Sequence, residues 1–193
     1  MPRELLILRH TKSDWDADAA SDFDRPLARR GKHDAPKIGA WLYREGLVPD
    51  YVVSSPARRA RQTAVKVCKA LEIGKDRISW DTDIYDATLG ALLDVVGRCP
   101  AASTTTLLVG HNPGLEALVR HLSGDDLAPP PDGQLTPTGA PPRSALPERW
   151  DQLPEDGKLM PTGALARLEM PERWDQLARG CAHLVSITLP RTL

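Results

Sequence analysis

The chain of 193 residues has few cysteines, almost no net charge and no long apolar run. Its three cysteines, Cys68, Cys99 and Cys181, lack metal-binding spacing. This pattern predicts a reducing compartment, the cytoplasm, with neither a disulfide framework nor a zinc site. A net charge of −1 predicts no general attraction to nucleic acid or to a membrane surface. Because no apolar run approaches ~18 residues and no apolar leader follows the first residues, we expect neither a transmembrane helix nor export.

Short apolar runs alternate with helical patterns along the chain. We expect strands where apolar residues are continuous, and helices where they recur at spacings of three and four. This alternation predicts an α/β protein with a mostly parallel sheet between two layers of helices. The expected strands are residues 5–8, 51–53, 106–109 and 183–189, and the expected helices are about residues 31–45, 57–71, 89–96 and 113–124.

Polar residues stand where three of these strands end. The first strand runs into Arg9 and His10, the second into a segment containing Arg58 and Arg59, and the third into His111. Ligands of parallel sheets bind beyond the carboxyl ends of the strands. The second and third segments also begin helices, whose free N–H groups favour anions. We therefore expect an oxyanion site, most simply for phosphate, with a histidine as the nucleophile.

Four motifs, in this order, resemble those of the histidine phosphatase superfamily. They are LRHTKSDW (8–15), DFDRPLARRGKHDA (22–35), SSPARRARQTA (54–64) and LLVGHNPGL (107–115). Within the superfamily they are similar to the small SixA-type phosphohistidine phosphatases, and the resemblance covers residues 3–124 and 158–190. It implies a phosphoglycerate mutase-like fold.

The resemblance also implies a role for each matching residue. His10 would attack phosphorus and carry the phosphoryl group covalently, while Arg9, Arg59 and His111 would surround the phosphoryl oxygens. Because guanidinium groups would neutralise the charge, we expect no metal and no other cofactor. Neighbouring side chains are expected to bind substrate, and these are Lys12, Ser13, Arg25 and Asn112.

Two of these assignments leave structural alternatives open. Arg25 could form a salt bridge with Asp22 or Asp24 instead of binding substrate. Phosphomonoesterases of the superfamily use an acidic side chain to protonate the leaving group, and Asp83 and Asp86 lie in the matching region. Neither is assigned as this acid, because Asp86 is well placed to cap the helix that follows it.

The resemblance implies a phosphatase that acts on a phosphohistidine protein or another phosphoramidate. Its partner would be a phosphorylated protein or a small phosphorylated substrate, and neither nucleic acid nor a membrane. Two alternatives stay open: a general small-molecule phosphomonoesterase of the same superfamily, and a catalytically silent phosphate-binding module. The lack of a clear general acid weighs against the first, and the complete set of two arginines and two histidines weighs against the second.

A tandem duplication interrupts the family pattern. Residues 132–153 and 156–177 are offset by 24 positions, and 15 of 22 residues are identical. The second copy contains GALARLEM (163–170), which resembles the penultimate strand of the family. The first copy has two prolines at the matching place, which cannot lie in the centre of a sheet. We expect one histidine phosphatase domain over residues 1–193, with an inserted segment at about residues 129–155.

Overall fold

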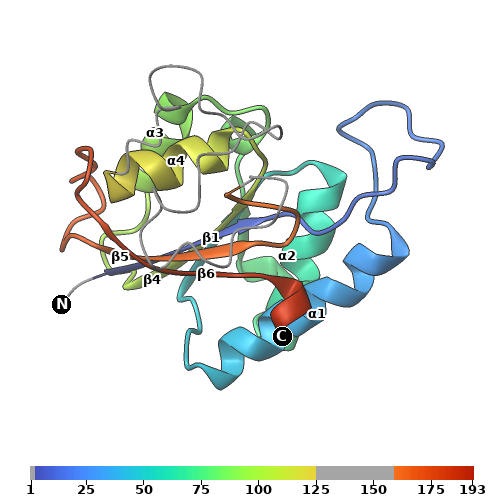
Figure 1. Cartoon of the computed structure of the whole chain (residues 1–193), viewed down its shortest axis with the longest axis horizontal. Coiled ribbons are helices and arrows are strands. Elements are labelled where there is room, and N and C mark those ends of the chain that lie inside the picture. The colour runs from blue at the N-terminus through green and yellow to red at the C-terminus, as the bar shows by residue number, and fades with distance from the viewer. Residues whose placement is uncertain (1–2, 125–158) are drawn as a thin grey trace, which may run out of the picture.

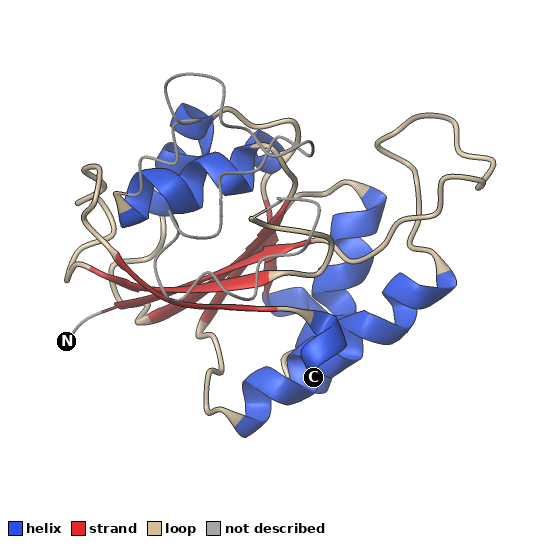
Figure 2. Cartoon of the chain, in the orientation of Figure 1, coloured by secondary structure: helices blue, strands red, loops and turns tan. Residues whose placement is uncertain are grey.

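A six-stranded sheet in the order β3-β2-β4-β1-β5-β6 organises the protein, in a computed structural model that describes residues 3–124 and 159–193 (Figure 2). The neighbours β3–β2, β2–β4 and β4–β1 are parallel, whereas β1–β5 and β5–β6 are antiparallel. The sheet is therefore mostly parallel, as expected. Its strands are β1 (Arg3–Arg9), β2 (Tyr51–Ser54), β3 (Ile78–Trp80), β4 (Thr105–Gly110), β5 (Leu165–Met170) and β6 (His183–Thr188).

Helices cover both faces of this sheet (Figure 1). The pair α1 (Arg29–Arg44) and α2 (Arg58–Ala70) lies on one face, and the pair α3 (Leu89–Gly97) and α4 (Gly114–Ser123) lies on the other. Three short 3-10 helices, Lys75–Arg77, Thr82–Ile84 and Pro190–Thr192, complete the described elements. None of the helices in the described ranges is long and apolar enough to cross a membrane.

The central strand β1 shows why the sheet needs both helical layers. Leu5 and Ile7 pack into the hydrophobic cluster that contains α3 and α4, whereas Leu6 and Leu8 pack into the cluster that contains α1 and α2. Successive side chains of a strand point to opposite faces, so a continuous apolar run requires cover on both. All four side chains are fully buried.

The structure departs from the sequence expectations in three places. β3 was not predicted, because three residues are too few to show a period. The strand expected to reach residue 189 ends at Thr188 and is followed by a 3-10 helix. The prediction that Asp86 caps α3 is wrong: the Thr88 hydroxyl accepts the N–H of Ala91 at 3.3 Å, and Asp86 has a left-handed φ of 51°.

The second copy of the duplication supplies β5, as its sequence suggested. The segment expected as an insertion, about residues 129–155, lies outside the described residues.

The first turn of α1 lies directly against the segment that follows β1. The Thr11 hydroxyl donates to the carbonyl oxygen of Gly31 at 2.9 Å, and the Ala28 N–H donates to the carbonyl oxygen of Lys12 at 3.0 Å. A Cβ atom at Gly31 would overlap that Lys12 oxygen. Glycine at position 31 therefore allows α1 to hold the backbone next to His10.

We predict that Gly31→Ala lowers the free energy of unfolding by roughly 1–3 kcal/mol, because the Lys12 backbone must move to admit the methyl group. The control is Gly90→Ala in α3, where the Thr88 hydroxyl oxygen is 3.9 Å from the added Cβ, an ordinary van der Waals distance. Alanine is favoured over glycine in helices by up to ~1 kcal/mol, so this variant should be neutral or more stable. Urea denaturation of both variants is the measurement, and equal stabilities would contradict the close approach at Gly31.

Candidate active site

The ends of β1, β2 and β4 bring two histidines and an arginine together. His10 follows β1, His111 follows β4, and Arg59 lies in the first turn of α2, just after β2. The ring centroids of His10 and His111 are 5.1 Å apart, and the Arg59 Nε–H donates to His10 Nε2 at 3.3 Å. All three side chains are buried. The structure thus groups residues that the sequence had placed at one sheet edge.

The hydrogen bonds of His10 define its tautomer. Its Nδ1 lies 2.8 Å from the carbonyl oxygen of Thr11, which can only accept, so Nδ1 carries the proton. Nε2 then holds a lone pair, which accepts from Arg59. Burial is the largest effect on the pKa of His10; together with the nearby charges of His111, Arg59 and Arg9 it outweighs the opposing Thr11 bond and lowers that pKa to about 3. His10 is therefore neutral at ordinary pH.

His111 has one buried ring nitrogen without a hydrogen-bond partner among the described residues. Its Nε2 lies 2.8 Å from the Ser55 hydroxyl, which itself accepts the N–H of Ala57 at 3.3 Å. A serine hydroxyl can both donate and accept, so this contact satisfies Nε2 in either tautomer of His111. The other ring nitrogen, Nδ1, is buried and has no hydrogen-bond partner among the described residues. Burial first, and then the charge of Arg59, lowers the pKa of His111 to about 3.

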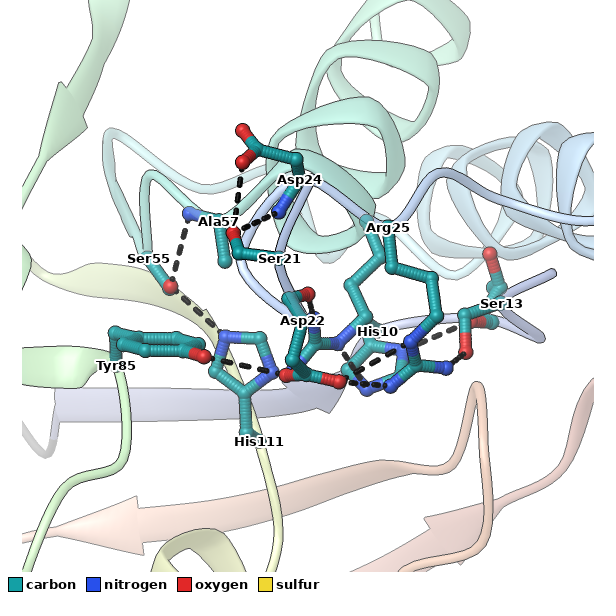
Figure 3. Close-up of polar contacts among 12 residues, drawn as sticks. His10, Ser13, Ser21, Asp22, Asp24, Arg25, Ser55, Ala57, Tyr85 and His111 are labelled. Carbon is teal, nitrogen blue, oxygen red and sulfur yellow. Dashed lines mark hydrogen bonds and ion pairs between the residues drawn. The ribbon is translucent and has the colours of Figure 1, made fainter. Parts of the chain in front are cut away.

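Asp22 lies at the centre of the polar contacts, beside Tyr85 and Arg25 (Figure 3). One carboxylate oxygen accepts from Arg25 Nη2 at 2.7 Å and Nε at 3.1 Å. The other accepts from Arg59 Nη2 at 2.8 Å and from the Tyr85 hydroxyl at 3.2 Å. Desolvation raises the pKa of Asp22, but hydrogen bonds from Arg25 and the charge of Arg59 outweigh it and lower this pKa to about 2. The carboxylate is therefore ionised.

Sequence reasoning missed Asp22 and Tyr85 as members of the site. Asp22 was considered only as a salt-bridge partner of Arg25, and that ion pair is present. Its signal was its position three residues before Arg25 in the DFDRPL motif. Tyr85 packs edge-on against His111 at 5.5 Å between ring centroids and against Phe23 at 5.0 Å, and no local pattern pointed to these contacts.

The expected substrate-binding residues fall into different positions. The Ser13 hydroxyl accepts a hydrogen bond from Arg25, and the Arg25 guanidinium carbon lies 3.7 Å from the ring centroid of Trp15, which is 71% exposed. Ser13 and Arg25 therefore belong to the same network as Asp22. The Lys12 side chain is exposed, and its main-chain carbonyl is the group that contacts α1.

Arg9 and Asn112 both bind the chain where the described structure resumes. Arg9 Nη1 and Asn112 Nδ2 each donate to the carbonyl oxygen of Met160 at 2.8 Å. Asn112 Nδ2 also donates to Glu116 Oε1 at 2.6 Å, and the same oxygen accepts the Met160 N–H at 3.0 Å. Asn112 thus contacts protein groups that hold the site together.

The two acidic residues considered as proton donors are not part of this network. The Asp83 carboxylate pairs with Arg98 at 2.9 Å, and Asp86 lies in a turn with a left-handed backbone. Asp22 is the carboxylate that contacts the arginines of the site. Within residues 3–124 and 159–193, no cluster of three or more His, Cys, Asp or Glu side chains could hold a metal ion.

The site carries an excess of positive charge. The guanidinium groups of Arg9, Arg25 and Arg59 face one carboxylate and two neutral imidazoles. Guanidinium groups match the geometry of phosphate oxygens, and the buried Nδ1 of His111, unpartnered within the described residues, leaves one further polar atom for a ligand to bind. An α/β sheet with such a site at its carboxyl edge is typical of enzymes that bind phosphate compounds.

Comparisons with known proteins identify the family. Residues 5–90 match the model of the histidine phosphatase superfamily, branch 1. An uncharacterized protein of Mycobacterium tuberculosis is 36% identical over 125 residues, covering 63% of this chain and 75% of that protein. An uncharacterized chloroplastic protein of Arabidopsis thaliana is 31% identical over 131 residues. The match covers 63% of this chain but only 60% of the Arabidopsis protein.

Two solved structures share the whole fold. A candidate phosphohistidine phosphatase, SixA, from Agrobacterium tumefaciens has a TM-score of 0.69 and 26% identity, covering 98% of this chain and 99% of that chain. A similarly named protein from Nakamurella multipartitia has a TM-score of 0.71 and 27% identity, and the match covers 98% of this chain and 97% of that chain. The chain belongs to the histidine phosphatase superfamily, in its SixA-type branch. It is a hydrolase of the phosphatase class.

We predict that the free energy of unfolding rises with pH up to about 6.5. The unfolded histidines have a pKa near ~6.5, so between about pH 3 and that value the unfolded chain binds more protons than the folded one. Stability is therefore lost as the pH falls, by roughly 2 kcal/mol per histidine between about pH 7 and about pH 5. Urea denaturation at the two pH values measures it, and the double variant His10→Asn, His111→Asn should flatten the profile. A wild-type profile as flat as that of the variant would show that neither histidine is held neutral.

Proposed function

We propose that the chain is a metal-independent phosphatase that forms a covalent phosphohistidine on His10 and acts on phosphohistidine or another phosphoramidate. The observation that carries this proposal is the state of His10: a buried, neutral imidazole whose Nε2 lone pair lies against a guanidinium group. The phosphorylated group belongs to a protein or a small molecule. The proposed compartment is the cytoplasm, on the basis of the cysteine usage described above.

Binding would exchange one set of hydrogen bonds for another. Arg59 Nε–H caps the lone pair of His10 when no phosphoryl group is present. A bound phosphoryl group offers better acceptors for this N–H and for the other guanidinium groups, and also for His111 in the tautomer that carries its proton on Nδ1. The lone pair of His10 is then released toward phosphorus. Positioning and charge neutralisation of this kind account for most of the catalysis of phosphoryl transfer.

The reaction would proceed in two displacements. First, His10 Nε2 forms a bond to phosphorus, the bond from phosphorus to the leaving nitrogen breaks, and the electron pair stays on that nitrogen, which water protonates. The phosphorylated ring is cationic, and the Thr11 carbonyl stabilises it by accepting the Nδ1–H. Second, water attacks phosphorus, the bond to Nε2 breaks, and inorganic phosphate and a proton are released. His10 returns to its original tautomer.

The leaving group decides between phosphoramidates and ordinary esters. Asp22 is ionised, with a pKa of about 2, so it carries no proton to donate, and Asp83 pairs with Arg98 outside the network around His10. An alkoxide leaving group needs such a proton, and a positioned acid contributes roughly 10²- to 10⁴-fold. An imidazole with a pKa near ~6.5 can take its proton from solvent. This difference supports a phosphohistidine-like substrate.

The first test concerns the nucleophile. We predict that His10→Ala lowers kcat by roughly 10³-fold or more, because the covalent step is lost. The matched control is His33→Ala, which removes an exposed histidine of α1 and should leave kcat unchanged. The reaction is run in EDTA to remove divalent metal ions and is quenched without acid, which would hydrolyse phosphohistidine. Mass mapping of the quenched wild type should then place phosphate on His10. Phosphate on another residue, or loss of the adduct on chelation, would refute the mechanism.

The second test concerns the leaving group. We predict a steep negative slope in a plot of log kcat/KM against leaving-group pKa for a series of phosphate esters, with phosphoramidates fastest and alkyl phosphates slowest. The reason is that charge on the leaving atom receives no proton from the protein. A flat line that becomes steep in Asp83→Asn or Asp86→Asn would instead reveal a general acid. That result would assign the chain as a general phosphomonoesterase.

A further inference from the structure

The arginines that the proposed mechanism uses for phosphate already hold an anion. One carboxylate oxygen of Asp22 binds the guanidinium group of Arg25 (Figure 3). The other binds the guanidinium group of Arg59. Carboxylates and phosphates bind guanidinium in the same forked geometry, so one can take the place of the other. The Asp22 carboxylate therefore stands where two phosphoryl oxygens would find their donors.

We propose that Asp22 is an internal competitor of the substrate: its carboxylate neutralises Arg25 and Arg59 in the resting enzyme, and a phosphoryl group binds by displacing it. This inference rests on the proposed function only in taking a phosphoryl group as the ligand. It assigns Asp22 as a residue that sets anion affinity and selectivity.

Burial shows which partner of these ion pairs can leave. The side chain of Asp22 is 50% exposed, whereas those of Arg25 and Arg59 are 11% and 7% exposed. Arg59 belongs to α2, and Arg25 is held by Ser13. Asp22 lies in the segment between β1 and α1, which has no regular secondary structure. The half-exposed carboxylate can exchange its arginine partners for water, whereas the buried guanidinium groups need another anion in its place.

Displacement also discriminates by charge. An incoming phosphoryl dianion gains more from the guanidinium groups than the monoanionic carboxylate loses. A monoanion, such as a sulfate monoester, gains no net charge interaction from the same exchange. Asp22 therefore favours dianions, and it also prevents inorganic phosphate from remaining tightly bound after turnover.

The experiment measures the affinity for inorganic phosphate, by titration calorimetry and by competitive inhibition of aryl phosphate hydrolysis. Asp22→Asn keeps the size of the side chain but removes its charge, so the dissociation and inhibition constants should both fall by roughly tenfold. The matched control is Asp24→Asn, because Asp24 carries the same charge in the same segment while its carboxylate binds Ser21. Its phosphate affinity should equal that of the wild type.

A second variant tests the same proposal while leaving Asp22 and its two arginine partners unchanged. Tyr85→Phe removes one donor to the Asp22 carboxylate, so displacement should become easier and phosphate should bind roughly two- to fivefold tighter. Unchanged or weaker binding in Asp22→Asn would overturn the proposal and make Asp22 a residue that positions the arginines. Thermal unfolding without phosphate confirms that each variant is folded.

The outcomes separate this inference from the proposed function. A wild type that cleaves phosphoramidates, combined with an Asp22→Asn variant that does not gain phosphate affinity, rejects the internal competitor alone. A wild type that cleaves no phosphate compound, combined with tighter phosphate binding in Asp22→Asn, rejects the proposed function alone. A wild type that cleaves no phosphate compound, combined with no phosphate binding in either protein, rejects both.

Discussion

The parallel pairing of β1 with β4 is the constraint on which the site depends. Its register places Arg9 beside Gly110, and the ladder continues with the His10 N–H donating to the Gly110 carbonyl at 3.1 Å. His10 and His111 therefore leave the sheet side by side. A slip of one residue would turn each side chain to the opposite face and separate the two rings. The hydrophobic clusters on both faces of β1 fix the register, so core packing determines the geometry of the polar site.

Local features of the chain were enough to predict most of the fold and the sheet edge at which the candidate site lies. Arg9 ends β1, and His10 and His111 follow β1 and β4, so sheet topology brings them to one edge. The choice of Arg59 over its neighbour Arg58 came from the family resemblance. Asp22 could not be placed in this way, because its contacts with Arg59 and Tyr85 span 37 and 63 residues of sequence. Similarly, threonine and aspartate both cap helices well, and the hydrogen bond from the Ala91 N–H, together with the backbone angles, identifies Thr88 rather than Asp86 as the cap.

Electrostatics in this site oppose stability and favour chemistry. Two imidazoles are buried beside guanidinium groups, and this arrangement keeps both imidazoles neutral. It disfavours the folded state, so the packing of the rest of the chain must offset that cost. The neighbouring carboxylate offsets part of the positive charge. Sites of this kind are a recognised source of the trade-off between stability and activity, because the residues are placed for a bound ligand. The fully buried residues of β1 and β4 provide the rigid support that this arrangement needs.

The hydrogen bond from Arg59 Nε to His10 Nε2 has a consequence for chemical selectivity. A neutral imidazole is reactive toward many electrophiles, including acylating and alkylating metabolites. Here the Arg59 guanidinium donates a hydrogen bond to the lone pair that would react. An uncharged electrophile offers this guanidinium no anion to bind instead, so the hydrogen bond stays in place. Only a reagent that brings several negatively charged oxygens can engage the guanidinium and uncover the nitrogen. In the proposed mechanism, the nucleophile would thus be protected from adventitious modification by the same side chain that admits its substrate.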